Sequence, residues 1–222
     1  MPLFLLILSF LLAALDWLAV TRNIRRLKLW TKPAVMVALI AWLWAAGGWV
    51  EPLPLFGLAL VFSLAGDVLL MMPPRWFILG LFSFLAAHIV YLAAFNPSQP
   101  PLIPMIVLLV IAGALMISIL PRLLRNIRIK PGARRLRVAA AFYSVFLTLM
   151  AISAVLTLFR PEWKPAAAAL AASGGLLFFT SDNLLAYDRF VKPVRYGRLM
   201  VRISYHLGQI ALIAAAVVQY VQ

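Results

Sequence analysis

The chain of 222 residues contains no cysteine, two histidines and six acidic residues. The absence of cysteine excludes disulfides, thiol nucleophiles, iron–sulfur clusters and cysteine-ligated zinc. Two histidines cannot form a three-histidine zinc site, although a mixed His/Asp site stays open. The sequence also has no GxSxG elbow and no glycine-rich phosphate loop. We therefore expect an activity that uses neither a bound metal nor an organic cofactor.

Charge is scarce as well, because 12% of the residues are charged while 65% are hydrophobic. A soluble domain is nearer one quarter charged and one half apolar. This chain has too little polar surface to cover a water-soluble globule. Most of it consists of apolar runs of about 20 residues, the length that lets a helix cross a bilayer. The composition predicts an integral membrane protein.

The runs predict an all-α membrane protein, a bundle of eight transmembrane helices forming one domain over residues 1–222. The expected spans are Leu3–Val20, Ala34–Val50, Pro54–Met72, Trp76–Phe95, Leu102–Leu120, Val138–Phe159, Ala166–Tyr187 and Leu199–Val221. No basic region precedes the first run, so we expect a retained span rather than a cleaved signal peptide. Pro33 is expected at the start of a helix. Trp30, Trp49, Trp76 and Trp163 fall at span ends, where indoles favour the membrane–water boundary.

The net charge of +14 comes from basic residues in short blocks between the apolar runs. Nucleic-acid binding would need a soluble basic face instead. Alternate loops carry five Lys/Arg in Thr21–Pro33, one in Pro73–Arg75, seven in Pro121–Arg137 and four in Asp188–Arg198. The opposite side holds only Arg160 and Lys164. The positive-inside rule puts the basic loops in the cytoplasm and both termini outside, in a bacterial inner membrane. Anionic membrane lipids are expected partners of these loops.

Ionisable residues inside a span are costly and mark functional sites by default. Asp16, Asp67 and Asp182 lie about 6–8 Å below the basic boundary of their spans at 1.5 Å per residue. His206 lies about 10 Å deep, and His88 about 18 Å deep, from the same side. The three carboxylates are therefore expected to face one cavity that opens to the cytoplasm.

Structural roles compete with these functional interpretations. Asp16 is close enough to the boundary to pair with Arg22 or Lys28. Asp67 and Asp182 each follow a small residue, which favours close helix packing. His88 with Tyr91, and Tyr205 with His206 and Gln209, form polar helix faces that suit interhelical hydrogen bonds as well as catalysis. Lys32 is either a snorkelling lysine or a partner at the acidic level.

Two neighbouring carboxylates in a low-dielectric site repel one another, so one holds a proton while the other stays ionised. This arrangement suits acid–base hydrolysis, in which one group donates a proton and the other activates water. Because the site opens at a membrane, the substrate is expected to be amphiphilic.

Span three and span seven contain similar segments, Ala65-Gly-Asp-Val-Leu-Leu and Thr180-Ser-Asp-Asn-Leu-Leu, and a histidine follows in the next span of each. This echo suggests two four-helix halves of the same orientation. In a chain rich in Leu and Ala, chance similarity is the alternative.

The order of several motifs resembles the YhhN-like lysoplasmalogenase family over nearly the whole chain. The motifs are Thr31-Lys32-Pro33, Gly66-Asp67-Val-Leu-Leu-Met71, Gly80…Phe84…His88…Tyr91, Ser181-Asp182-Asn183-Leu-Leu-Ala186 and Tyr205-His206…Gln209. The resemblance implies hydrolysis of the vinyl-ether bond of a lysoplasmalogen, a lysophospholipid, to a fatty aldehyde and glycerophosphoethanolamine or glycerophosphocholine. Asp67 and Asp182 would be catalytic. The substrate-binding residues would be Asp16, Lys32, His88, Tyr91, Ser181, Asn183, Tyr205, His206 and Gln209. A basic rim of Lys32, Arg189 and Arg202 would hold the phosphate.

Two other classes of function fit the same residues. A transporter could use Asp67 and Asp182 as a proton relay, but such proteins have broken helices, and here only Gly47–Gly48 and Gly174–Gly175 hint at breaks. A non-catalytic lipid-binding protein would need the pocket but not both carboxylates. Neither the true lipid nor an oligomeric partner follows from the sequence.

The loop charges give a direct prediction of topology. Reporter fusions after Pro97 and at the C-terminus should report the periplasm, and fusions within Pro121–Arg137 should report the cytoplasm, because the latter loop carries seven basic residues. A reporter that places the C-terminus in the cytoplasm would show that the number of spans is odd.

Overall fold

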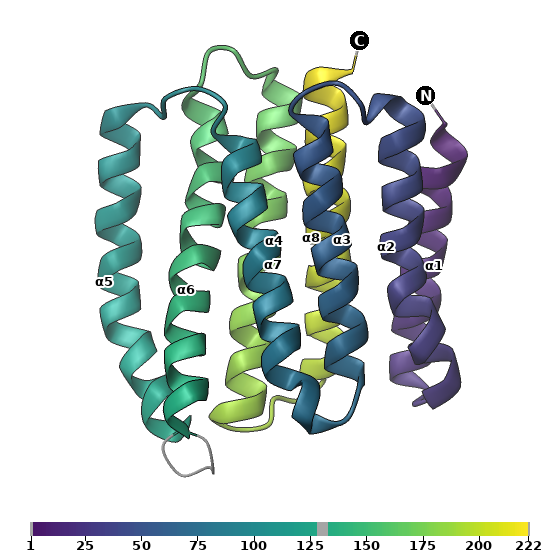
Figure 1. Ribbon diagram of the computed structural model, residues 1–222, viewed down its shortest axis with the longest axis vertical. Coiled ribbons are helices and arrows are strands. Elements are labelled where there is room, and N and C mark those ends of the chain that lie inside the picture. Colours follow the sequence, from purple (N-terminus) through teal and green to yellow (C-terminus); the bar gives the residue numbers. More distant parts are fainter. Residues whose placement is uncertain (1, 128–132, 222) are drawn as a thin grey trace.

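Eight α-helices cross a single bundle in the computed structural model, which describes residues 2–127 and 133–221 (Figure 1). The helices are α1 Leu3–Thr21, α2 Arg25–Gly47, α3 Leu53–Met71, α4 Phe77–Phe95, α5 Leu102–Ile127, α6 Ala133–Leu156, α7 Pro165–Phe190 and α8 Gly197–Tyr220. Two short 3₁₀ turns, η1 Pro74–Trp76 and η2 Thr157–Phe159, follow α3 and α6.

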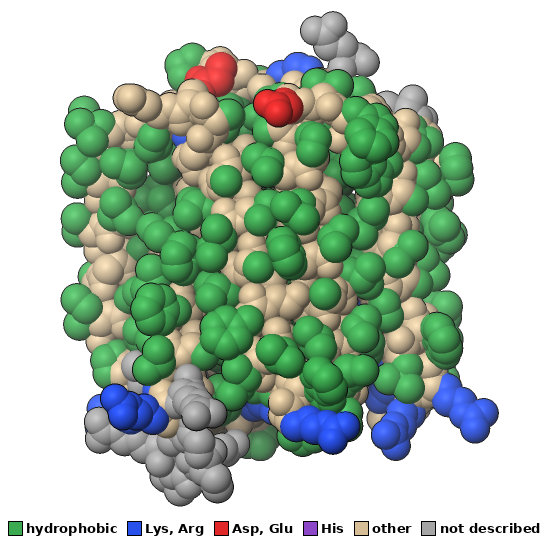
Figure 2. All heavy atoms as spheres, in the orientation of Figure 1, with side chains coloured by type: hydrophobic (Ala, Val, Ile, Leu, Met, Phe, Trp, Pro, Cys, Tyr) green, Lys and Arg blue, Asp and Glu red, His purple; other side chains and the backbone are tan. Residues whose placement is uncertain are grey.

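Seven of the helices are long and apolar enough to cross a membrane, and α5 contains a shorter apolar segment, Leu102–Ser118, among its described residues. Figure 1 shows α5 running alongside the others over a similar height. Hydrophobic side chains cover the middle of the visible face in Figure 2. The predicted all-α membrane protein, a bundle of eight helices, is confirmed.

The two ends of the bundle differ in charge. Both termini lie at one end in Figure 1, and the Lys and Arg side chains visible in Figure 2 gather mainly at the other. We call the second end, which carries the turns after α1, α3 and α7, the basic end. The alternation of loop charge read from the sequence therefore corresponds to two opposite ends of one bundle. Which end faces the cytoplasm stays a prediction.

Three predicted boundaries were wrong at the basic end. Helix α2 begins at Arg25, well before Ala34, so Pro33 lies inside a helix rather than at its start. Most of the expected loop Pro121–Arg137 is helical in α5 and α6, and its residues 128–132 lie outside the described part of the chain. Long basic side chains let a helix continue past the apolar layer, because their stems pack while their charged heads reach water. Hydropathy therefore marks the apolar layer and not the end of the helix.

The tryptophans at the span ends do not all behave as predicted. Trp30 and Trp49 are 78% and 79% exposed, as expected of side chains at the membrane–water boundary. Trp163, by contrast, is buried and packs against the rings of Phe95 and Tyr220. It belongs to the core at the end of the bundle that holds the termini.

Helix α8 is the most buried of the candidate spans and contacts α7, α1, α2 and α3. Its crossing with α7 depends on two facing glycines. A methyl group on Gly208 would lie 2.9 Å from the backbone nitrogen of Phe178, and one on Gly174 would lie 2.8 Å from that of Leu212. The small residues let the two backbones approach closely, as in other membrane helix pairs. This contact holds in place the helices that carry most of the candidate site.

We predict that Gly208→Ala destabilises the protein by about 1–3 kcal/mol, because a buried backbone must shift to admit the methyl group. Gly113→Ala is the matched control, since nothing lies within 4 Å of a methyl group at that position. The control should be neutral or slightly stabilising, because alanine favours helix more than glycine does. Thermal unfolding in detergent would measure both, and equal melting temperatures for the two variants would contradict the close crossing.

Candidate active site

A pocket of about 80 Å³ lies toward the basic end, between α4, α6, α7 and α8. Its walls are mainly apolar, with Leu81, Phe84, Leu147 and Ala186 among them. Nine polar or charged side chains also line it: Lys32, Tyr143, Ser144, Ser181, Asp182, Asn183, Arg189, Arg202 and Tyr205. A cavity of this size holds a few water molecules or the reacting part of a larger ligand.

Asp182 of α7 lies on the pocket wall, with 9% of its side chain exposed. The hydroxyl of Tyr143, from α6, donates a hydrogen bond to Oδ2 of Asp182. His88 Nε2, from α4, lies 3.0 Å from the Tyr143 hydroxyl and 3.3 Å from the same carboxylate oxygen. Because the single phenol proton goes to Asp182, the contact with Tyr143 requires a proton on His88 Nε2. Three helices thus hold one carboxylate at the edge of the pocket.

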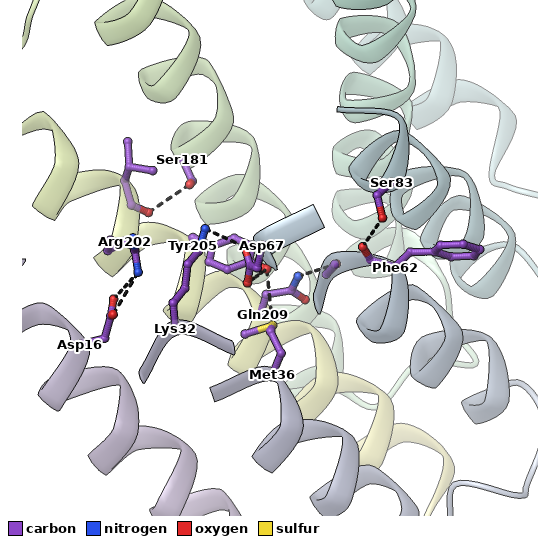
Figure 3. A network of polar contacts seen from close by, with 12 residues as sticks. Asp16, Lys32, Met36, Phe62, Asp67, Ser83, Ser181, Arg202, Tyr205 and Gln209 are labelled. Carbon is purple, nitrogen blue, oxygen red and sulfur yellow. Dashed lines mark hydrogen bonds and ion pairs between the residues drawn. The ribbon is translucent and has the colours of Figure 1, made fainter. Parts of the chain in front are cut away.

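Asp67 of α3 is fully buried and has a different set of partners. Its Oδ1 lies 2.6 Å from the ammonium of Lys32, and its Oδ2 accepts a hydrogen bond of 2.9 Å from the hydroxyl of Tyr205 (Figure 3). Lys32 and Tyr205 line the pocket, and Asp67 lies behind them. A buried carboxylate with a lysine at this distance is an ion pair. The structure brings both predicted aspartates to one site but gives each its own partners.

Asp16 of α1 is also fully buried, and its predicted partners were wrong. Arg202 of α8, rather than Arg22 or Lys28, binds both carboxylate oxygens at 2.7 and 3.0 Å (Figure 3). Thr31 donates a further hydrogen bond of 2.7 Å to Oδ1. Because α1 packs against α8, Arg202 contacts Asp16 although it lies far along the chain, whereas the basic residues close to Asp16 in sequence do not.

Two more predicted residues, Tyr91 and Gln209, take part in a buried chain of hydrogen bonds and do not line the pocket. The Tyr91 hydroxyl donates to Oε1 of Gln209 at 2.7 Å, and Nε2 of Gln209 donates to Ser63 at 2.9 Å. These bonds satisfy the polar groups that face one another between α4, α8 and α3. Their place in the structure is that of an interhelical hydrogen-bond network.

His206 faces α1 and not the pocket, because its Nδ1 accepts a hydrogen bond of 3.2 Å from the indole of Trp17. Ser181 lines the pocket and donates to the Val201 carbonyl at 3.0 Å, which links α7 to α8. Asn183 also lines the pocket, and its amide donates to the Phe179 carbonyl of its own helix. Among the described residues, no three His, Asp or Glu side chains gather closely enough to hold a metal ion.

The three basic residues of the expected phosphate rim differ in what they contact. Lys32 and Arg202 are each bound to a buried aspartate. Arg189 lines the pocket, and its guanidinium lies 3.7 Å from the ring centroid of Phe77 and 6.0 Å from that of Phe190. Arg189 contacts aromatic rings where the other two contact carboxylates, so its charge is the least compensated of the three.

Sequence reasoning missed Tyr143, which contacts both Asp182 and His88. Its position inside an apolar span was the available signal, because a buried tyrosine needs a partner for its hydroxyl. No neighbouring motif marked it. The rings of Phe84, Phe178 and Tyr205 also pack edge to face beside the pocket, and His88 packs on Phe178.

The pairing of Asp16 can be tested by stability. Arg202→Met should destabilise the protein by about 3–5 kcal/mol, because it leaves a buried carboxylate without its cation. Adding Asp16→Asn to that variant should recover a large part of the loss. Lys28→Met is the control, since the Lys28 ammonium contacts Asn23 and not Asp16. Thermal unfolding in which Lys28→Met is as damaging as Arg202→Met would contradict the assignment.

Comparison with known proteins agrees with the resemblance read from the motifs. Residues 27–217 match the model of the YhhN family. The chain is 28% identical to the lysoplasmalogenase TMEM86B of Homo sapiens over 83% of this chain and 72% of that protein. It is 31% identical to the TMEM86B lysoplasmalogenase of Sus scrofa over 69% of this chain, which spans 59% of that relative's length. The TMEM86A lysoplasmalogenase of Bos taurus is 27% identical over 71% of this chain and 63% of its own.

No solved structure matches the chain. The family model covers most of its length, including Asp67, Asp182 and the residues that bind them. Asp16 and Trp17, on α1, precede the matched residues. The chain belongs to the YhhN family.

Proposed function

We propose that the protein is a lysoplasmalogenase, an enzyme that hydrolyses the vinyl-ether bond of a lysophospholipid. The observation that carries the proposal is the Asp182 carboxylate, held by Tyr143 and His88 on the wall of a mainly apolar pocket. Relatives named lysoplasmalogenase support the same reaction. The products would be a fatty aldehyde and glycerophosphoethanolamine or glycerophosphocholine.

The reaction begins with a proton transfer to carbon. Protonated Asp182 gives its proton to the vinyl carbon farther from the ether oxygen, and the electrons of the double bond form the new C–H bond. The cation that results is shared between the ether oxygen and the adjacent carbon. Asp182, now ionised, stabilises this cation and then removes a proton from the water that attacks it. The hemiacetal collapses to the aldehyde and releases the glycerol hydroxyl.

Asp67 has a different part in this proposal. Because its carboxylate is bound to Lys32 and lies behind the pocket wall, it fixes the positions of Lys32 and Tyr205 rather than touching the substrate. The two aspartates predicted to act as a pair therefore act unequally, Asp182 as the acid and base and Asp67 as a positioning residue.

Arg189 is the group that we assign to the phosphate. It lies two turns beyond Asp182 on α7, about 10 Å along the helix axis at 1.5 Å per residue. Its guanidinium presents several N–H donors that match phosphate oxygens. The lipid would enter with its head group at the basic end and its vinyl ether deeper in the bundle.

The packing on the side of the pocket away from the basic end favours an enzyme over a transporter. The rings of Phe84, Phe178 and Tyr205 contact one another there, and His88 covers Phe178. A transporter would need a path through this layer. A lipid-binding protein would have no use for the Tyr143–Asp182–His88 arrangement.

The direct test is turnover by purified protein in detergent. Lysoplasmalogen and its ester analogue are incubated separately, and released aldehyde and fatty acid are measured. Aldehyde from the vinyl ether without fatty acid from the ester supports the proposal. Fatty acid release alone would replace it with an esterase, and no product from either would leave a binding role.

Asp182→Asn should lose at least about 10²-fold in kcat, because general acid–base catalysis contributes about 10²–10⁴-fold. Asp67→Asn should also lose activity, because the ion pair that holds Lys32 in position would be lost and the contact with Tyr205 would change. The matched control is Asp188→Asn at the basic end, where Oδ1 of Asp188 accepts a hydrogen bond from the Val194 nitrogen. An amide oxygen keeps that bond, so the control should stay within about twofold of the parent. A folded Asp182→Asn variant with near-normal kcat would remove Asp182 from the reaction.

A further inference from the structure

A second, larger cavity lies next to the candidate active site. It is a groove of about 180 Å³ between α5, α6 and α7. Its walls are almost entirely apolar and include Leu108, Ile111, Ala112, Leu115, Ala151 and Leu176. Ser144, Leu147 and Asn183 line both this groove and the pocket that contains Asp182. The two cavities are therefore neighbours that share one stretch of wall.

The groove runs away from the pocket along the bundle. On α6 its lining extends from Ser144 to Val155, about 16 Å along the helix axis. On α7 it extends from Asn183 back to Leu176, in the same direction. One leaflet of the hydrocarbon layer is about 15 Å thick, which is the depth occupied by one lipid chain.

The few polar groups of the groove have partners within their own helices. Ser144 donates to the Ala140 carbonyl, Thr148 to the Ser144 carbonyl, and the Asn183 amide to the Phe179 carbonyl. The groove therefore presents hydrocarbon rather than free donors to an occupant. Ile111, Leu115 and Leu176 are each about half exposed, so its side is open toward the surrounding lipid.

A larger apolar groove, of about 780 Å³, lies between α1, α2 and α3 and is lined by Leu8, Val37 and Met71 among others. It shares no lining residue with the pocket of Asp182. Of these two grooves, the one beside α5 continues from the pocket. That continuity distinguishes it from an ordinary lipid-facing depression.

We infer that the groove between α5, α6 and α7 binds the hydrocarbon chain of the substrate and makes the enzyme selective for chain length. This inference rests on the proposed function, because it places the vinyl ether at Asp182. With Arg189 at the phosphate, a chain that leaves Asp182 past Leu147 enters the groove directly. The occupant is a single unbranched chain, and it lies along the bundle as it would in the adjoining leaflet.

Ala112→Phe tests the assignment by filling the groove part of the way along. Ala112 lies about 12 Å from the level of Leu120, where the groove begins on α5. Val110→Phe is the matched control, because Val110 is exposed on the same helix and does not line the groove. Ile111→Trp, at a half-exposed lining position, is a second variant for use if Ala112→Phe does not fold.

Two measurements separate the inference from the proposed reaction. The first is binding of lysophospholipids with saturated alkyl ethers of eight and of sixteen carbons, which cannot be hydrolysed at a vinyl ether. The second is aldehyde release from the corresponding alkenyl lipids. Ala112→Phe should weaken binding of the long chain by at least about fivefold, because the added ring occupies the space that the far end of the chain needs. Binding of the short chain should change by less than about twofold. Val110→Phe should change neither.

A folded Ala112→Phe or Ile111→Trp protein that binds both chains as the parent does would overturn the inference, and so would an equal loss for both chains. If the parent releases no aldehyde yet shows the chain-length effect on alkyl-ether binding, the proposed reaction fails and the chain site stands. If aldehyde is released and filling the groove has no effect that depends on chain length, the reaction stands and the chain site fails.

Discussion

Neutralisation of buried carboxylates is the constraint on which the basic half of this bundle depends. An ionised carboxylate without a partner is very costly in a low-dielectric interior. Asp16 and Asp67 are both fully buried, and consecutive residues of α2 bind them, Thr31 the first and Lys32 the second. One turn of α8 supplies the remaining partners, Arg202 for Asp16 and Tyr205 for Asp67. A helix that slid by one turn would leave at least one of these charges uncompensated. The charges therefore set the mutual register of α1, α2, α3 and α8, while small residues set how closely α7 and α8 approach.

Asp182 differs from the other two aspartates in its partners. Asp16 and Asp67 each contact a cation, whereas the groups found on Asp182 among the described residues are the Tyr143 hydroxyl and the His88 imidazole. Its side chain also reaches the pocket, where Asp67 is shielded. The Asp182 carboxylate, bound by a phenol and an imidazole, lies on the pocket wall, where a ligand can contact it. This contrast is the physical reason for giving the three aspartates unequal roles in the proposed reaction.

The sequence predicted the number and type of the elements well and the partners of the polar residues poorly. Apolar run length reports how much of a helix lies in hydrocarbon, so the spans were recovered, but α2 and α5 continue beyond that layer on basic residues. Depth along each helix placed Asp67 and Asp182 toward the same end of the bundle. The depth of a residue in its span does not say toward which neighbouring helix its side chain points. The rotation of each helix about its axis determines that direction, and with it the contacts of Asp16 with Arg202 and of Asp182 with Tyr143. His206 was expected beside the aspartates and instead faces Trp17. Those pairings depend on helices that are adjacent in space and distant in sequence.

The faint repeat seen in the sequence has a counterpart in the contacts, and the place where it fails is informative. If α1–α4 correspond to α5–α8, then Asp67 and Asp182 are equivalent, and so are the helices that bind them: α2 and α8 for Asp67, α6 and α4 for Asp182. The correspondence breaks at the first helix of each half. Helix α1 packs on α2 and α8, where Asp16 and Arg202 anchor it, whereas α5 packs on α6 and α7 and, in its described part, has no comparable ion pair. Both halves carry an apolar groove beside their first helix, but the groove between α1, α2 and α3 shares no lining residue with the pocket of Asp182, whereas the groove between α5, α6 and α7 shares three.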